Sequence, residues 1–383
     1  MTPRAYTGWV VGGCLAVLAP VMALNLLLLA NDYRHDKNRL ASEWQQQTGG
    51  VTYAPPISSN RAFKTLRLAD RAPEINALVF GSSTAMSITA DAFPPGISAY
   101  NFAQSGNGLI SVIGEARDVT VRYDERVRWL VIPLDWALGF VYDGSEPPAS
   151  DLSPTKISMS VAPPLMAQLR EALSLPRITT LALALHDVAR VADHSAAIRT
   201  IFSEPAGETY RCADGLMARD YDLTFRGECV GFRADGSATF ADQKRITAAL
   251  APGVVAQAAS ASSQYAAALE RTAGAPDANL LGHLTNLLQQ ARTKGIHVVF
   301  FLPPLIPELD VRLTASAHSG EKLRRTKAVL AAWAKQQQVT LLDAGPSEQY
   351  GCVPTEFIDA HHALPPCYRK IVPRLIAAQP AKP

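Results

Sequence analysis

Short apolar runs alternate with longer amphipathic segments in two parts of the chain. Apolar, partly β-branched runs occur at residues 77–80, 97–102, 128–134, 297–302 and 339–342. Each is typical of a buried strand. Segments with apolar residues at helical spacing follow or separate them, at 109–123, 278–294, 320–337 and 366–378. This alternation favours an α/β fold with a parallel sheet and helices on both faces.

The regular alternation stops between these two parts, and residues 142–277 are too long for a simple crossover. We expect an α-rich insertion there, within a domain of residues 76–383. Residues 165–192 indicate helices interrupted at Pro176, 209–240 indicate turns and short strands, and 241–273 indicate a helix broken near Pro252 and Gly253. Residues 40–73 are mixed and polar, and we expect residues 31–75 to form a stalk or lead-in that packs onto the domain.

Residues 8–30 are apolar and uncharged. At 1.5 Å per residue, roughly 23 residues are enough to span a bilayer. A cleaved signal peptide is the competing interpretation, but the run is long and no convincing cleavage site follows Leu29. The positive-inside signal is weak or reversed. We expect an uncleaved signal anchor that follows a cytoplasmic N-terminus of residues 1–7, with the rest of the chain outside the cytoplasm.

The cysteines agree with that orientation. Cys14 lies in the apolar segment, and the other four form two neighbouring pairs, Cys212 with Cys229 and Cys352 with Cys367. Four cysteines allow three pairings; local pairing is the simplest, and four reduced, buried thiols are the alternative. Each local bridge would close a loop of roughly 15 residues, worth about 3 kcal/mol. Such bridges belong in an oxidising compartment.

Composition excludes several functional classes. A formal net charge of +2 gives no electrostatic footprint for nucleic acid. The chain has no P-loop, no GxGxxG, no CxxC and no Cys/His metal spacing. We expect no nucleic acid, no metal and no cofactor.

The first predicted strand ends at Gly81, Ser82 and Ser83, after which residues 84–93 can start a capped helix. A serine there lies above the carboxyl end of the sheet, where open α/β folds bind ligands. Backbone N–H groups at a helix start favour negative charge. An ordinary strand–turn–helix with capping serines gives the same pattern.

Two further polar stretches follow predicted strands. Gly106 lies after the second strand, and Asp359 and His362 lie in the loop after the last one. Hydrolytic serine chemistry needs a nucleophile, a base, a group that orients the base, and oxyanion donors. Asp359 is close enough in sequence to fix the orientation of the His362 ring. A bridge between Cys352 and Cys367 would restrict the loop that carries both residues.

The order of these motifs resembles the SGNH/GDSL hydrolase superfamily. Residues 81–83 (GSS) take the place of Gly-Asp-Ser, 101–106 (NFAQSG) resemble the glycine block, and 359–362 (DAHH) resemble the closing block. The GSS form and the anchor are similar to membrane-anchored cell-envelope members, such as the alginate O-acetylation proteins and the D-alanine transfer protein. The resemblance covers residues 76–135 and 277–378, and not the insertion. It implies an α/β, three-layer, flavodoxin-like parallel sheet with helices on both faces.

The resemblance implies Ser83 as nucleophile, His362 as base and Asp359 as the orienting acid. It also implies the backbone N–H groups of Ser83 and Gly106 as oxyanion donors. Ser82 is then a turn residue, and His361 is more readily a surface or supporting residue than the base.

One position departs from the superfamily, which usually has an Asn after the third strand. This chain has Asp135 and Trp136 there. An ionised aspartate cannot donate a hydrogen bond, so the Trp136 indole or Asn107 would have to substitute, and Asp135 could equally cap a helix. One lost oxyanion donor typically costs about 2.7–4 kcal/mol in the transition state. The completeness of the oxyanion hole is therefore open.

The resemblance implies a single-pass protein of the cell inner membrane with a periplasmic domain. Its implied activity is ester hydrolysis or O-acyl transfer through an acyl-Ser83 intermediate, on polysaccharide or another acylated envelope substrate. A multispanning membrane acyltransferase is the implied partner.

Tyr210, Tyr221 and Phe225 either form a sugar-stacking face or pack locally. A non-catalytic SGNH-like scaffold subunit of an acylation or export complex is the alternative function, which the missing Asn keeps open.

Overall fold

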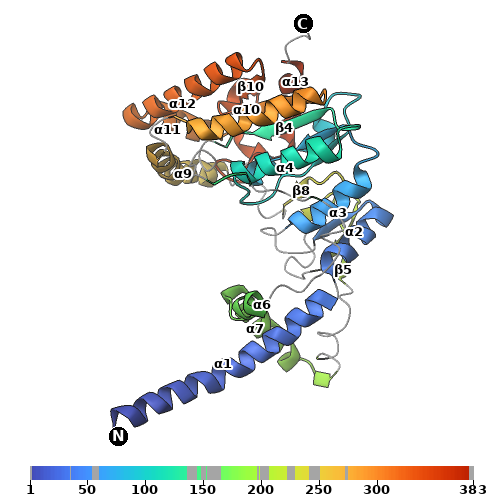
Figure 1. The fold of residues 1–383 in the computed structure, drawn as a ribbon, viewed down its shortest axis with the longest axis vertical. Helices are drawn as coiled ribbons and strands as arrows, with labels where there is room; N and C mark the ends of the chain where they lie inside the picture. Colours follow the sequence, from blue (N-terminus) through green and yellow to red (C-terminus); the bar gives the residue numbers. More distant parts are fainter. Residues whose placement is uncertain are drawn as a thin grey trace. The chain divides into compact units, whose positions relative to one another are not determined.

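The computed structural model in Figure 1 describes residues 2–34, 36–53, 60–135, 145–147, 152, 165–195, 198, 207–221, 229–240, 251–271 and 275–378. The chain divides into two compact units. The N-terminal unit comprises residues 1–40 and 158–206, and the sheet unit comprises residues 41–157 and 207–383. The predicted insertion is therefore shared between the two units.

The core of the sheet unit is a five-stranded parallel sheet in the order β10-β9-β4-β2-β3. Its strands are β2 (Ala77–Val79), β3 (Ala99–Asn101), β4 (Trp129–Pro133), β9 (His297–Leu302) and β10 (Thr340–Asp343). Most of their side chains are buried, which explains why the sequence shows continuous apolar runs here. The predicted mixed α/β architecture with a parallel sheet is confirmed. Counted along the chain from β2, the order is 2-1-3-4-5, one of the common orders of doubly wound sheets.

Helices cover this sheet. They are α4 (Leu109–Arg122), α10 (Ala278–Thr293), α11 (Pro307–Ala315), α12 (Ala317–Gln336) and α13 (Pro365–Ala377). Figure 1 shows α4 beside α10, and Trp333 of α12 donates to Thr285 of α10 at 3.1 Å. Right-handed crossovers place α4, α10 and α12 on one face of the sheet, while α13 packs against β9 and β10. Helix α11, which begins at Pro307, was not predicted.

The segment after β2 differs from the expected helix at residues 84–93. It forms two short 3-10 helices, η2 (Ser83–Ala85) and η3 (Ala90–Ala92). The buried Asn101 amide of β3 donates to the carbonyls of Ala85, Met86 and Ile88, at 2.8, 3.2 and 2.8 Å. In a continuous helix these carbonyls would accept backbone N–H groups of the following turn. Here the side chain of a neighbouring strand replaces those helical hydrogen bonds.

A second, smaller sheet lies in the same unit, in the order β5-β6-β1-β7-β8. It comprises β1 (Val51–Tyr53), β5 (Glu208–Arg211), β6 (Met217–Asp220), β7 (Gly231–Phe232) and β8 (Ala238–Thr239). The central strand β1 comes from the predicted lead-in, and the other four come from the predicted insertion. Helices α2 (Lys37–Thr48) and α3 (Arg61–Arg71) flank β1 in sequence, and Phe63 of α3 stacks on Phe232, with ring centroids 5.8 Å apart.

The N-terminal unit contains α1 (Pro3–Arg34), α6 (Leu165–Ala172) and α7 (Leu175–Arg190). Residues 5–31 of α1 are long and apolar enough to cross a membrane, with a mean hydropathy of 2.3, a test that a signal sequence would also pass. Both α6 and α7 contact α1. Pro176 lies in the first turn of α7, where proline is tolerated.

Helix α9 (Ala251–Arg271) belongs to the sheet unit and contacts α11 and α12. Pro252 and Gly253 lie in its first turn, so the break predicted there is the start of the helix. The preceding part of the predicted helix, residues 241–250, lies outside the described residues.

Candidate functional site

Three side chains from distant parts of the sequence form one hydrogen-bonded chain. Ser83 follows β2, whereas Asp359 and His362 lie in the loop before α13. Ser83 Oγ lies 2.8 Å from His362 Nε2, and His362 Nδ1 lies 2.7 Å from Asp359 Oδ2. The first distance is well within the 4 Å that we would accept for a substrate-free serine–histidine pair.

Asp359 is held as a carboxylate that orients the histidine. Its Oδ1 accepts the backbone N–H groups of His361 and His362, each at 2.9 Å. Burial opposes ionisation, but the hydrogen bond from His362 and the nearby imidazole charges hold the pKa of Asp359 well below its ordinary value. An ionised carboxylate only accepts. The proton of neutral His362 must therefore be on Nδ1, which leaves Nε2 free to accept from the Ser83 hydroxyl.

Gly81 and Ser82 set the turn that presents Ser83. Gly81 has φ 133°, and a Cβ there would lie 2.3 Å from Cγ of Pro133 on β4. Only glycine lets the serine turn approach β4 this closely. Ser82 Oγ accepts from the backbone N–H of Thr84 at 3.4 Å, which agrees with the predicted capping role.

Asp135 lies at this site. Its Oδ2 is 3.4 Å from Ser82 Oγ, and its charge raises the pKa of the buried Tyr265 and Tyr368 in addition to the larger effect of burial. The carboxylate therefore lies next to the serine turn. This turn follows β2, which pairs with β4 at the point where the order of strands in the sheet reverses direction. Trp136 lies outside the described residues.

Two backbone N–H groups are the predicted oxyanion donors, those of Ser83 and Gly106. Within the part of the chain that the structure describes, neither the backbone N–H of Ser83 nor that of Gly106 has a hydrogen-bond partner. Gly106 has φ 68° in an exposed turn. The Asn107 amide donates to Glu115 Oε2 at 3.0 Å, so one of its two N–H bonds is engaged by that carboxylate. That Gly106 faces the same space as Ser83 stays a prediction.

A buried charged cluster fixes the loop that carries Gly106. Lys64 Nζ donates to the carbonyls of Asn101 and Ala103, and Glu115 accepts from Gln104 at 2.9 Å and from Asn107. Burial lowers the pKa of Lys64 and raises that of Glu115. The sequence interpretation missed both residues. The one signal in the sequence is that each charged residue falls at a position on the buried face of its helix, α3 or α4.

His361 packs beside the hydrogen-bonded chain without joining it. Its ring centroid lies 4.1 Å from that of His362 and 5.8 Å from that of Tyr265 on α9. Burial and the neighbouring His362 lower the pKa of His361 to about 4. His361 is thus a neutral supporting ring near pH 7. Tyr265 of α9 contacts the loop that carries Asp359, His361 and His362, which we call the closing loop. It was not predicted as a site residue.

The closing loop also offers a set of metal-ligating atoms. Asp359, His361 and His362 each present one such atom, all within 4.8 Å of one another. A cation bound through His362 would compete with its hydrogen bonds to Asp359 and Ser83. Metal binding and serine activation are therefore mutually exclusive uses of this histidine.

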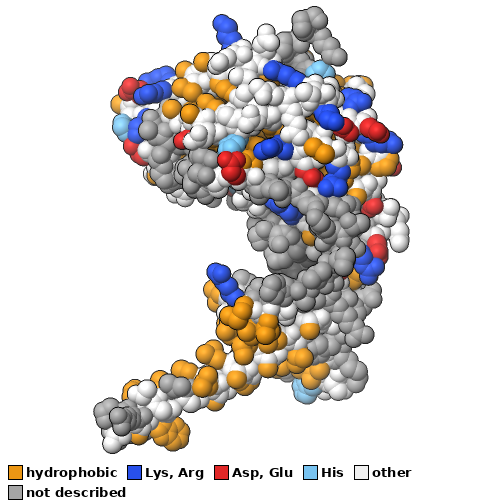
Figure 2. Space-filling model, in the orientation of Figure 1, with side chains coloured by type: hydrophobic (Ala, Val, Ile, Leu, Met, Phe, Trp, Pro, Cys, Tyr) orange, Lys and Arg blue, Asp and Glu red, His pale blue; other side chains and the backbone are white. Residues whose placement is uncertain are grey.

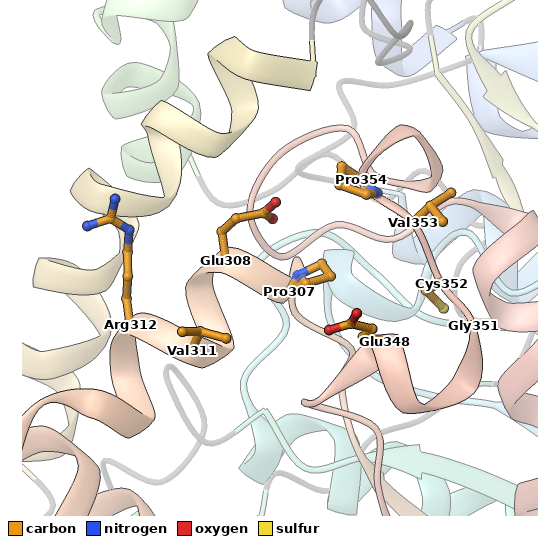
Figure 3. Close-up of a pocket in the computed structure, with 9 residues that line it drawn as sticks. All are labelled: Pro307, Glu308, Val311, Arg312, Glu348, Gly351, Cys352, Val353 and Pro354. Atoms are coloured by element: carbon orange, nitrogen blue, oxygen red, sulfur yellow. The ribbon is translucent and has the colours of Figure 1, made fainter.

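Two disulfides are present, Cys212–Cys229 and Cys352–Cys367. The second closes the loop that carries Asp359 and His362. The same loop borders an open groove of about 630 Å³, shown in Figure 3, between α11 and residues 348–354. In that view the Glu308 carboxylate points from α11 toward Pro354. The nine lining residues do not include Ser83, Asp359 or His362.

The predicted aromatic positions pack locally where they are described. Tyr210 packs against the small buried cluster of Val51, Cys212 and Ala218, and Tyr221 is buried beneath the Arg219 guanidinium. Phe225 lies outside the described residues.

Comparison with known proteins found no matching family model, curated protein or solved structure.

Proposed function

We propose that this protein is an SGNH-type serine acyl esterase or O-acyltransferase, with Ser83 as nucleophile, His362 as general base and Asp359 as the orienting acid. The observation that carries the proposal is the continuous hydrogen-bonded chain from Ser83 Oγ through His362 to the Asp359 carboxylate. A serine hydroxyl is a weak nucleophile unless a positioned base removes its proton. This chain supplies both the base and the group that fixes its tautomer.

The reaction follows from these positions. His362 Nε2 takes the proton of Ser83 as Oγ attacks the acyl carbonyl, and the imidazolium is stabilised by the Asp359 carboxylate. The carbonyl oxygen becomes an oxyanion, for which the N–H groups of Ser83 and Gly106 are the proposed donors. Collapse expels the alcohol, which receives the proton from His362. Water or a sugar hydroxyl then attacks the acyl-Ser83 ester by the same steps in reverse order.

Two aspects of the sheet support the superfamily assignment. The serine follows the first strand of the parallel sheet, and the Asp–His loop lies between the last strand and the last helix. The reversal of strand order falls between β2 and β4, the position at which open α/β sheets bind ligands. The GSS, NFAQSG and DAHH motifs thus occur in the chain positions that the superfamily resemblance requires.

The location follows from α1 and the disulfides. An uncleaved α1 would anchor the chain in the inner membrane, and two disulfides are typical of an oxidising compartment such as the periplasm. An esterified envelope or exported polysaccharide is the proposed substrate, with a multispanning acyltransferase as the proposed acyl donor partner. Both rest on the resemblance to envelope members.

One observation favours a second function, a non-catalytic scaffold subunit. Asp135 brings a carboxylate to within 3.4 Å of Ser82 Oγ, on the residue that precedes the proposed nucleophile. A negative charge there would oppose the oxyanion, whereas a donor would stabilise it. Slow or absent turnover with an intact fold is the expected signature of this alternative.

The decisive experiment is the intact mass of the full-length protein after exposure to an activated acetyl ester. The esterase or transferase should acquire one acetyl group on Ser83, and Ser83→Ala should acquire none. A correctly folded wild-type protein that is never acylated would favour the scaffold.

A further inference from the structure

The α6–α7 pair is the part of the described insertion that packs with α1. Asn25, inside the candidate membrane span, is fully buried, and its Nδ2 donates to the Ala172 carbonyl at 2.7 Å. That carbonyl is at the C-terminal end of α6, where helical carbonyls lack partners. Leu29 of α1 and Leu181 of α7 are also buried. The contact is therefore specific: it pairs the Asn25 amide N–H with the Ala172 carbonyl, while Asn25 Oδ1 is buried without a hydrogen-bond partner among the described residues.

This contact fixes the depth of the hairpin along α1. Asn25 lies six residues before Asn31, the end of the span, which is about 9 Å along the helix. The span itself, residues 5–31, is about 40 Å long, whereas the hydrocarbon core is about 30 Å thick. For a span centred on the core, about 5 Å project at each end, so the turn between α6 and α7 lies within about 4 Å of the boundary between acyl chains and headgroups at the Asn31 end.

The hairpin presents an apolar face that none of the described residues of its own unit covers. Leu175, Ile178 and Leu185 are exposed, and their spacing places them on one side of α7. Leu165 and Met166 are exposed at the start of α6. Figure 2 shows hydrophobic side chains gathered over α6 and α7 and along α1. In water such a face is an unusual feature.

Charged residues border this face. Arg170 and Arg190 are exposed, and Arg177 pairs with Glu171 at 3.3 Å beside the turn. Charges at the turn exclude it from the acyl-chain interior. An apolar face with arginines at its border is typical of helices that lie in the headgroup layer of anionic membranes.

We propose that α6–α7 is an interfacial membrane hairpin, which rests in the bilayer surface beside α1 with Leu175, Ile178 and Leu185 against lipid acyl chains. The occupant of the apolar face is lipid because the face is continuous with a helix of membrane-spanning length and lies at the headgroup boundary of that span. The serine chemistry plays no part in this inference.

The test measures the depth of single labels in vesicles. The full chain carries Cys14→Ser, which leaves both disulfides, and one added cysteine labelled with an environment-sensitive fluorophore. Leu175→Cys and Leu185→Cys report on the hairpin, Leu15→Cys on the span, and Arg325→Cys on an exposed charged position of α12. The protein is reconstituted in phosphatidylcholine and phosphatidylglycerol vesicles that contain lipids spin-labelled near the headgroup or near the acyl-chain end.

We expect a blue-shifted emission at Leu175 and Leu185, with stronger loss of fluorescence from the shallow spin label than from the deep one. Leu15 should be quenched by the deep label, and Arg325 by neither. Hairpin labels that behave like Arg325 would overturn the proposal, as would an unquenched Leu15. Hairpin labels that are unquenched in vesicles but protected from a water-soluble thiol reagent in native membranes would also overturn it, and would indicate a protein partner.

Discussion

The rings of His361 and His362 lie with centroids 4.1 Å apart and planes tilted by 41°, yet only His362 reaches Ser83. Both backbone N–H groups are bound by the same oxygen of Asp359, so one carboxylate shapes the whole turn. Within the described part of the chain, its other oxygen accepts only from His362. The two neighbouring histidines therefore have separable roles, which point mutations can distinguish.

Asp359→Asn should lower turnover by about 10⁴-fold, because the asparagine amide can hold His362 in the wrong tautomer. Loss of the carboxylate would also leave the imidazolium unstabilised. His361→Ala should cause a far smaller loss, since its ring supports His362 only by packing. Steady-state hydrolysis of an activated acetyl ester, with circular dichroism as the folding control, measures both. An equal loss in the two variants would contradict the assignment of roles.

His361 should make folding sensitive to mild acid. Burial and His362 hold its pKa at about 4, whereas an unfolded histidine titrates near pH 6.5. Between these values the unfolded chain binds more protons at this side chain than the folded protein, so this contribution to stability falls as the pH falls. Denaturant unfolding between pH 7 and pH 4 should show a steeper loss for wild type than for His361→Gln. Parallel curves would mean that His361 is already accessible to protons in the folded protein.

The features that the sequence predicts correctly are those that depend on apolar runs, short separations and the order of motifs along the chain. The five strands are found because most of their residues are buried and read as continuous apolar runs. The local cysteine pairs follow from short separations of 17 and 15 residues. Ser83 and His362, 279 residues apart, meet at 2.8 Å because both follow strands of one parallel sheet. The fold class and the Ser83–His362 pair thus depend on the order of strands and motifs along the chain, which can be seen in the sequence.

Long-range hydrogen bonds determine what the sequence does not reveal. The Asn101 amide replaces helical bonding after Ser83, so η2 and η3 form where a helix was expected. Strand β1 of the predicted lead-in pairs with β6, more than 160 residues away. Lys64 and Glu115 are ordinary charges on amphipathic helices until the fold buries them. No local propensity predicts any of these three features.

Zn²⁺ should inhibit the reaction. Asp359, His361 and His362 can all contact one cation, and coordination through neutral imidazoles would remove His362 from Ser83. Added Zn²⁺ should lower turnover reversibly, EDTA should restore it, and His361→Ala should need more Zn²⁺ for the same inhibition. The measurement is a titration of ester hydrolysis. Activity that EDTA abolishes and Zn²⁺ restores would show instead that the cluster is a functional metal site.

The two disulfides should differ in their effect on activity. Replacing either pair by serine should lower the free energy of unfolding by about 3 kcal/mol in the chain-entropy model. The Cys352 and Cys367 double variant should also lose turnover, because that bridge closes the loop carrying His362. The Cys212 and Cys229 double variant is the matched control and should keep its turnover, since that bridge lies beside the small sheet. Denaturant unfolding and ester hydrolysis together give the comparison; equal turnover losses would contradict it.

Acylation of Ser83 is the event on which the proposed function depends. The full-length protein in detergent is mixed with an activated acetyl ester, quenched in acid and measured as intact mass, followed by peptide mapping. We predict that wild type gains one acetyl group on the peptide containing Ser83, that His362→Ala acquires it far more slowly, and that Ser83→Ala never acquires it. An acetyl group that appears equally on Ser83→Ala, or a folded wild type that acquires none, would contradict the account.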